Sequence, residues 1–130
     1  MSEVDKLKQV VGKRVVVWGV ISLVIGIVLL FSFQLTLLGG IGVQAIIWGL
    51  IDALIGASIM FKQKEQSIEK ISQTVSKSIK FDILVLIVGI IVIIVYLQDP
   101  YMMGNGIGVV IQGFFLLVLD NIYHKTLMNL

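Results

Sequence analysis

Four long apolar runs constrain this chain more than any other feature. At about 1.5 Å per residue, a helix of each length can cross a hydrocarbon core of about 30 Å. The third run is the shortest, and Lys80 and Asp82 at its entry are expected to snorkel to the interface. We therefore predict an all-α, four-helix transmembrane bundle that forms one integral membrane domain over residues 1–130, with spans at 15–38, 40–61, 81–97 and 106–123.

The composition agrees with this class. Hydrophobic residues make up 58% of the chain, more apolar surface than a soluble domain of this size can bury. There is no cysteine and only one histidine, which excludes disulfides, thiolate chemistry and Cys- or His-based metal clusters. We expect no cofactor, no metal and no enzymatic activity, since no candidate nucleophile has a nearby base.

The basic residues indicate an orientation. All ten lie in the segments 1–14, 62–80 and 124–130, and the two remaining loops have none. The positive-inside rule places these three segments and both termini in the cytoplasm, in a multi-pass protein of a prokaryotic cell membrane. The lipid bilayer is the expected partner. Nucleic-acid binding is not expected, because the lysines are spread over short juxtamembrane segments.

The polar segment 62–80 carries an apolar stripe at helical spacing, formed by Ile68, Ile71, Val75 and Ile79. This pattern predicts a cytoplasmic or interfacial amphipathic helix between the second and third spans, or an extension of the third. Its lysines would bind anionic headgroups or form a docking surface for a membrane or cytoplasmic protein. Turns are expected at Leu38–Gly40 and between Gln98 and Gly106, where Gly104-Asn105-Gly106 is typical of a turn.

The chain also shows signs of an internal repeat. Residues 24–27 resemble residues 87–90 at an offset of 63 (87 − 24), and the glycines at 40 and 42 resemble those at 104 and 106 at an offset of 64 (104 − 40). The two helical hairpins are therefore interpreted as parallel repeats, related by an axis along the membrane normal.

The second span carries a polar stripe. Gln44, Trp48 and Asp52 are four residues apart, and the fourth span repeats the outer pair as Gln112 and Asp120. A carboxylate at the centre of a membrane helix costs about 2.5–3.5 kcal/mol, which makes Asp52 a candidate for function. These five residues form the predicted intramembrane polar cluster.

No Lys or Arg lies at the depth of Asp52, so this carboxyl group is expected to be protonated or hydrogen-bonded. Its candidate partners are backbone carbonyls and the side chains of Gln44, Gln112, Ser22 and Trp48. Depth favours Gln112 over Asp120, which is expected to be solvated near the cytoplasmic interface. Three roles remain open for Asp52: a structural hydrogen bond between helices, proton- or cation-coupled transport, and a polar contact between protomers.

Small residues line the neighbouring face of the second span. This predicted packing face comprises Ala45, Gly49, Ala53, Gly56 and Ala57. Small side chains at such spacing let membrane helices approach closely. We therefore expect the second and fourth spans to lie in the interior of the bundle.

Residues 106–120, with their Gln-Gly-x-Phe-Leu-Leu core and closing Asp120, resemble the last helix of a family of uncharacterised small four-helix prokaryotic membrane proteins. The segment Trp48–Asp52 is similar to the second helix of that family. The resemblance implies four helices and no assigned activity. The favoured interpretation is a non-enzymatic structural or interaction subunit. The alternative is a small homo-oligomeric transporter or channel with Asp52 as coupling carboxylate, since four short helices leave little room for a cavity in one chain.

Overall fold

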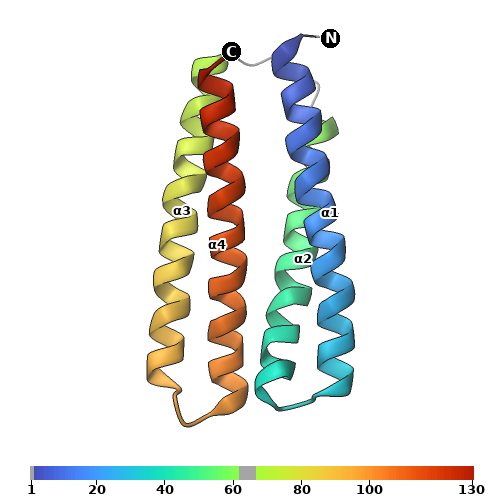
Figure 1. The fold of residues 1–130 in the computed structure, drawn as a ribbon, viewed down its shortest axis with the longest axis vertical. Coiled ribbons are helices and arrows are strands. Elements are labelled where there is room, and N and C mark those ends of the chain that lie inside the picture. Colours follow the sequence, from blue (N-terminus) through green and yellow to red (C-terminus); the bar gives the residue numbers. More distant parts are fainter. Residues whose placement is uncertain (1, 62–66) are drawn as a thin grey trace.

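The chain folds into two helical hairpins that stand side by side (Figure 1). The structure is a computed structural model, which describes residues 2–61 and 67–130. Both termini lie at one end of the bundle, here called the terminal end, and the turns within the hairpins lie at the other, the loop end (Figure 1). All four helices are long and apolar enough to cross a membrane. They are α1 (Glu3–Ser32), α2 (Leu37–Phe61), α3 (Ile68–Val95) and α4 (Pro100–Met128).

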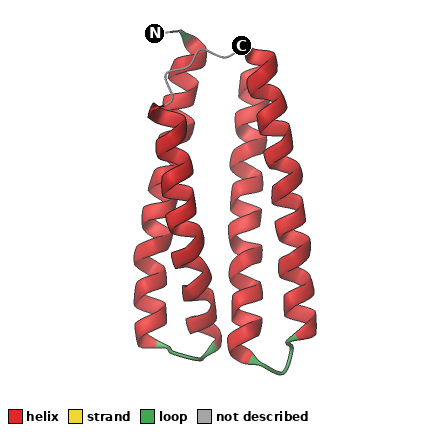
Figure 2. Cartoon of the chain, turned by 180° about the vertical axis from the view of Figure 1, so that it is seen from behind, coloured by secondary structure: helices red, strands yellow, loops and turns green. Residues whose placement is uncertain are grey.

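The predicted all-α class is confirmed, since the described residues contain helices and no strand (Figure 2). Helix α2 packs against both α1 and α4, and α3 packs against α4. Helices α2 and α3 make little contact with each other. The bundle is therefore held together along the α2–α4 contact and is more open between α2 and α3.

Glycine pairs join α1 to α2. Three glycines on each helix, seven residues apart, face one another, and a Cβ on any of the α1 glycines would lie 2.6–2.7 Å from the carbonyl oxygen of its partner. Such distances leave no room for a side chain, so the two backbones are in direct contact. The pairs are Gly12 with Gly56, Gly19 with Gly49, and Gly26 with Gly42.

The predicted packing face of the second span agrees with this contact in part. Gly49 and Gly56 belong to the glycine pairs, and Ala45 is also buried. Ala53 and Ala57 are only half-buried. The close contact with α1 repeats every seven residues, whereas Ala45, Gly49, Ala53 and Ala57 of the predicted face are spaced by four.

The first turn lies earlier than predicted. Helix α1 ends at Ser32, residues 33–36 form the turn, and α2 begins at Leu37, so the glycines at 39 and 40 are helical. A Cβ at Gly40 would collide with the Tyr101 carbonyl oxygen of α4. The glycine is therefore needed for contact between helices, and the residue with positive φ in this turn is Leu35, at 53°.

The second turn was also misplaced by the sequence, because α4 begins at Pro100 instead of residue 106. The Asp99 side chain caps the helix by accepting a hydrogen bond of 3.2 Å from the Met102 amide, and proline is favoured directly after such a cap. The predicted turn at Gly104-Asn105-Gly106 is wrong. Gly104 contacts α2 and Gly106 contacts α3, so these glycines serve helix packing.

The predicted amphipathic helix is not a separate element in the described residues. Residues 68–80 form the first part of α3, capped by Ser67, while 62–66 lie outside the described residues. The stripe residues Ile71 and Val75 are buried at the terminal end, together with four residues of α1 and α4. The apolar face of this part of α3 therefore packs against α1 and α4 and completes the core at the terminal end. The other members of this cluster are Val11, Val15, Tyr123 and Leu127.

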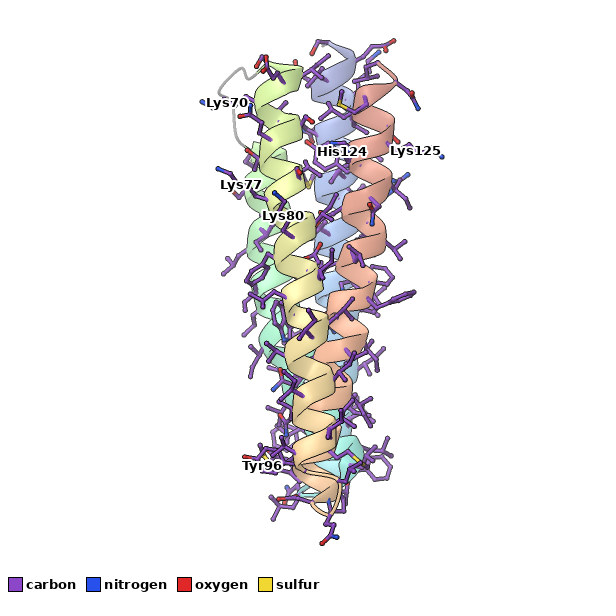
Figure 3. The ribbon with its side chains drawn as sticks, turned by 90° about the vertical axis from the view of Figure 1, so that its left-hand side faces the viewer. Lys70, Lys77, Lys80, Tyr96, His124 and Lys125 are labelled. Atoms are coloured by element: carbon purple, nitrogen blue, oxygen red, sulfur yellow. The ribbon has the colours of Figure 1, made fainter. Side chains whose placement is uncertain are left out.

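Helices α3 and α4 also meet through polar groups at the terminal end. The Nε2 atom of His124 lies 3.1 Å from the Ser72 hydroxyl (Figure 3 labels His124). Lys77 and Lys80 project outward from α3 on the same side of the molecule (Figure 3). The terminal half of α3 thus has one face in the bundle and one charged outer face.

Candidate functional site

A cavity of about 490 Å³ lies in the terminal half of the bundle. Its size falls within the range of about 300–1,000 Å³ that is usual for small-molecule sites. All four helices contribute to its wall, which is mostly apolar but contains the carboxylates of Asp52, Asp82 and Asp120. We expected one chain to have little room for a cavity, and this expectation is wrong: the cavity forms within a single chain.

Asp52 is the most deeply buried of these carboxylates. Its side chain is 0% exposed, and neither carboxylate oxygen has a hydrogen-bond partner among the described residues. A buried polar group without a partner costs stability, and a buried charge costs more. The residue is held there by its helix, because Gly49 and Gly56 on either side fix α2 against α1.

Asp82 and Asp120 form a second part of the site. Asp82 is 3% exposed, and its carboxyl group lies within hydrogen-bonding reach of that of Asp120. Two carboxyl groups form such a bond only when one of them carries a proton. Asp52 lines the same mostly apolar cavity, where charges act on one another more strongly than in water. The three groups therefore form one electrostatic cluster.

Asp82 does not lie where the sequence predicts. It was expected to snorkel to the interface, but it points into the bundle and lines the cavity. A signal for this was present in the spacing, because Asp82 lies seven residues after Val75 and seven before Gly89, both of which are buried. Asp120 was expected to be solvated, and it is half-buried in the cavity wall instead.

Lys8 is the one basic side chain that the described residues contribute to the cavity wall. It is 8% exposed, although it belongs to the basic segment before the first predicted span. Lysine is rarely buried so far. The wall thus combines three acidic side chains with one basic side chain, which leaves an excess of negative charge if all are ionised.

The amides predicted to join Asp52 lie in two separate networks. In the first, Trp48 Nε1 donates to Gln44 Oε1 at 3.2 Å, and Gln44 Nε2 donates to Asn105 Oδ1 at 2.8 Å. In the second, Trp18 Nε1 donates to the Gln112 amide, at Oε1, over 2.9 Å. Nε2 of the same amide donates to Ser22 Oγ at 3.3 Å.

These networks correct the expected pairing of Asp52. Neither includes Asp52, and of the five predicted cluster residues only Asp52, Trp48 and Asp120 line the cavity. The register of α2 on α4 follows from Gly108, which contacts Gln44 at an offset of 64 (108 − 44). At that offset Asp52 is level with residue 116, one helical turn from Gln112 and one from Asp120. The depth of Asp52 along the bundle therefore does not favour Gln112 over Asp120 as its neighbour.

The described residues contain no group of three or more His, Cys, Asp or Glu side chains that could hold a metal ion. On the loop side of the cavity, the Trp18 ring stacks on Phe115 with centroids 3.7 Å apart. Trp18 also belongs to the network of Gln112. Packed rings and paired amides therefore occupy this level of the bundle, whereas the three cavity carboxylates have no partner among the described residues except one another.

Comparison with known proteins gives a family but no activity. No curated protein and no solved structure matches the chain. One family model matches residues 14–121, a range that includes all three cavity aspartates but not Lys8. The chain therefore belongs to the DUF6992 family, a family of unknown function.

Proposed function

We propose that this protein is a small membrane carrier that binds a cation in the cavity and exchanges it for a proton, with Asp52 as the coupling carboxylate. The observation that carries the proposal is the complete burial of Asp52, without a hydrogen-bond partner, in the wall of a cavity that also holds Asp82 and Asp120. Proteins retain such an unfavourable group where function requires it. The proposal involves no catalysis.

The location of the basic residues supports an orientation for this carrier. With both termini in the cytoplasm of a cell membrane, the cavity would lie in the cytoplasmic half of the bilayer. The amides of the loop half would then separate it from the other side. Alternating access requires this barrier to open, and breaking the hydrogen bonds of Gln44 and Gln112 is the step that we assign to it.

An internal duplication would explain why the cavity forms where it does. Gly26 contacts Gly42 in the first hairpin, and Gly89 contacts Gly106 in the second, at offsets of 63 (89 − 26) and 64 (106 − 42). The same offsets relate Gly19 to Asp82 and Gly56 to Asp120 (82 − 19 = 63; 120 − 56 = 64). We propose that acidic residues replaced packing glycines in the second hairpin, which separated the helices locally.

A structural or interaction subunit is the second candidate function. The glycine contacts between α1 and α2 favour it, because such close packing gives a rigid scaffold. Under this interpretation Asp52 would form an interhelical or interprotomer hydrogen bond. Within one chain its oxygens form no such bond with the described residues, so a contact between copies would have to supply it.

Asp52→Asn separates the two functions, because it removes the charge at nearly constant volume. Purified wild-type and variant proteins would be reconstituted in liposomes that contain a pH-sensitive dye, and K⁺, tetraethylammonium or n-octyltrimethylammonium would be added outside. We expect at least one of these cations to drive proton movement in the wild type and not in Asp52→Asn, with an unchanged melting temperature. Asp99→Asn is the control, since it removes a carboxylate from the α4 cap outside the cavity.

Two results would overturn the carrier. One is a wild type that moves no protons with any of the three cations. The other is an Asp52→Asn variant that moves them as well as the wild type does. If the variant fails to assemble and the wild type moves no protons, the structural role is established in its place.

A further inference from the structure

The cavity has an opening on the side of the bundle, between α2 and α3. These two helices make little contact, and several of their side chains both line the cavity and reach the outer surface. On α2 these are Ile51 and Ile55, which are 39% and 49% exposed, and on α3 Phe81 is 53% exposed. The cavity therefore communicates with the surface through a gap, here called the α2–α3 portal, which is bordered by these apolar residues and, nearer the terminal end, by the exposed Ser58 and Thr74.

The portal lies in a part of the molecule that faces lipid if the helices span the membrane. Ile51 and Ile55 belong to the candidate span Leu37–Phe61 and Phe81 to the span Ile68–Val95. Lys77 and Lys80, which project outward from α3 (Figure 3), come shortly before Phe81 in the sequence, and lysines near the end of a membrane span can reach the headgroups. If these lysines reach the headgroups, the portal opens at the boundary between headgroups and acyl chains, where amphiphilic molecules accumulate.

The wall of the cavity does not suit an inorganic ion. Such an ion requires oxygen ligands around it, and the described residues hold no cluster of side chains that could ligate a metal. Most of the wall is hydrocarbon, and three aromatic residues contribute to it: Trp48, Phe81 and Tyr123. A volume of about 490 Å³ also exceeds what a bare ion occupies.

An ammonium group with a hydrocarbon body matches both parts of this wall. Its N–H groups can donate to Asp52, whose two oxygens have no partner among the described residues. Because Asp52 is 0% exposed, neighbouring side chains of the wall must move aside as the ammonium group binds. Its carbon atoms would lie against the apolar side chains, and its charge near the faces of aromatic rings. The side chain of Lys8 is itself an alkylammonium group, and it lines this cavity.

We propose that the cation bound by this protein is an amphiphilic organic ammonium that enters the cavity from the bilayer through the α2–α3 portal. This inference rests on the proposed function and adds the substrate class and the route. The alkyl chain crosses the portal between Ile55 and Phe81, and the ammonium group reaches Asp52. A proton on the carboxyl group is displaced as the cation binds.

The ligand class can be tested by protection against dicyclohexylcarbodiimide, a lipid-soluble reagent that adds to protonated carboxyl groups. The protein is labelled in nanodiscs, and the modified aspartate is then identified by mass spectrometry of its peptides. We expect n-octylammonium to slow labelling of Asp52 at least tenfold, whereas n-octanol at the same membrane concentration and K⁺ do not. Equal protection by n-octanol, or protection by K⁺ alone, would overturn the ligand class.

The route can be tested with two tryptophan substitutions on α2. Ile55→Trp narrows the portal, while Leu54→Trp places the same side chain on a residue that is 73% exposed and does not line the cavity. We expect Ile55→Trp to slow the labelling of Asp52 about tenfold and Leu54→Trp to leave it unchanged. Equal rates in the two variants, or faster labelling of the wild type by a water-soluble carbodiimide, would overturn the lateral route.

The two proposals fail in different ways. If K⁺ or tetraethylammonium drives Asp52-dependent proton movement but n-octylammonium gives no protection, the carrier stands and the amphiphilic ligand is wrong. If n-octylammonium protects Asp52 but no cation moves protons, the site is a binding site and the carrier is wrong.

Discussion

Replacing Asp52 with leucine should stabilise the protein, although Asp52 is the residue to which we assign the central role. The reason is that both carboxylate oxygens are buried and have no partner among the described residues. Leucine removes these unsatisfied groups and adds apolar atoms beside a cavity that can receive them. A residue selected for packing would behave in the opposite way.

The magnitude follows from the burial. An unsatisfied buried polar group costs about 1–3 kcal/mol, and an aspartate at the centre of a membrane helix costs about 2.5–3.5 kcal/mol on insertion scales. Part of this cost persists in the unfolded state when that state remains in the micelle. We therefore expect Asp52→Leu to raise the free energy of unfolding by about 1–3 kcal/mol.

Gln112→Leu is the matched comparison. Gln112 is as deeply buried as Asp82, at 3% exposure, but it accepts from Trp18 and donates to Ser22. Its replacement leaves both partners unpaired, so we expect a loss of about 1–2 kcal/mol. The two free energies can be measured by titrating dodecyl sulfate into mixed micelles and following helicity by circular dichroism. A loss of stability in Asp52→Leu as large as in Gln112→Leu would refute the reasoning, because it would mean that Asp52 has a structural partner.

Three further predictions follow from other contacts. Gly19→Ala places a Cβ 2.6 Å from two backbone atoms of α2 and should cost about 1–3 kcal/mol, whereas Gly113→Ala, whose closest contact is a side-chain carbon at 3.0 Å, should cost less than half as much in the same titration. Asp82→Asn and Asp120→Asn should be non-additive, with a coupling of about 1 kcal/mol in a double-mutant cycle, and additive effects would contradict their contact. Asp99→Ala should cost about 1 kcal/mol because it removes the cap of α4, and an unchanged unfolding curve would contradict this role.

The candidate site was only partly predictable. The expense of a carboxylate in an apolar run identified Asp52 from the sequence. Asp82 was not identified in this way, because a carboxylate near the end of an apolar run is expected to lie at the membrane interface. Its contribution depends on the rotation of α3 about its axis, which directs Asp82 toward α4 and into the cavity. The rotation of a helix about its axis is set by its packing against other helices, so the composition of the apolar run does not predict it.

The predicted turns at the glycines are wrong for a related reason. In a soluble protein Gly39-Gly40 and Gly104-Asn105-Gly106 indicate turns, because glycine weakens helices. In this bundle they lie inside α2 and α4, where Gly40 and Gly104 bring the two backbones together. The actual turns use Leu35 with positive φ and the pair Asp99-Pro100. Glycine in an apolar helix is therefore better read as a contact residue than as a helix terminator.

The sequence by itself determined the number of helices, their apolar character and the presence of Asp52 among them. These properties are local, since the length and hydrophobicity of each run suffice to predict a helix that can cross a bilayer. Only the tertiary structure decided that Asp52 lines one cavity with Asp82 and Asp120, whereas Gln112 is hydrogen-bonded to Trp18 and Ser22. That outcome depends on the register and rotation of separate helices, which the glycine contacts between backbones fix to within a fraction of a turn.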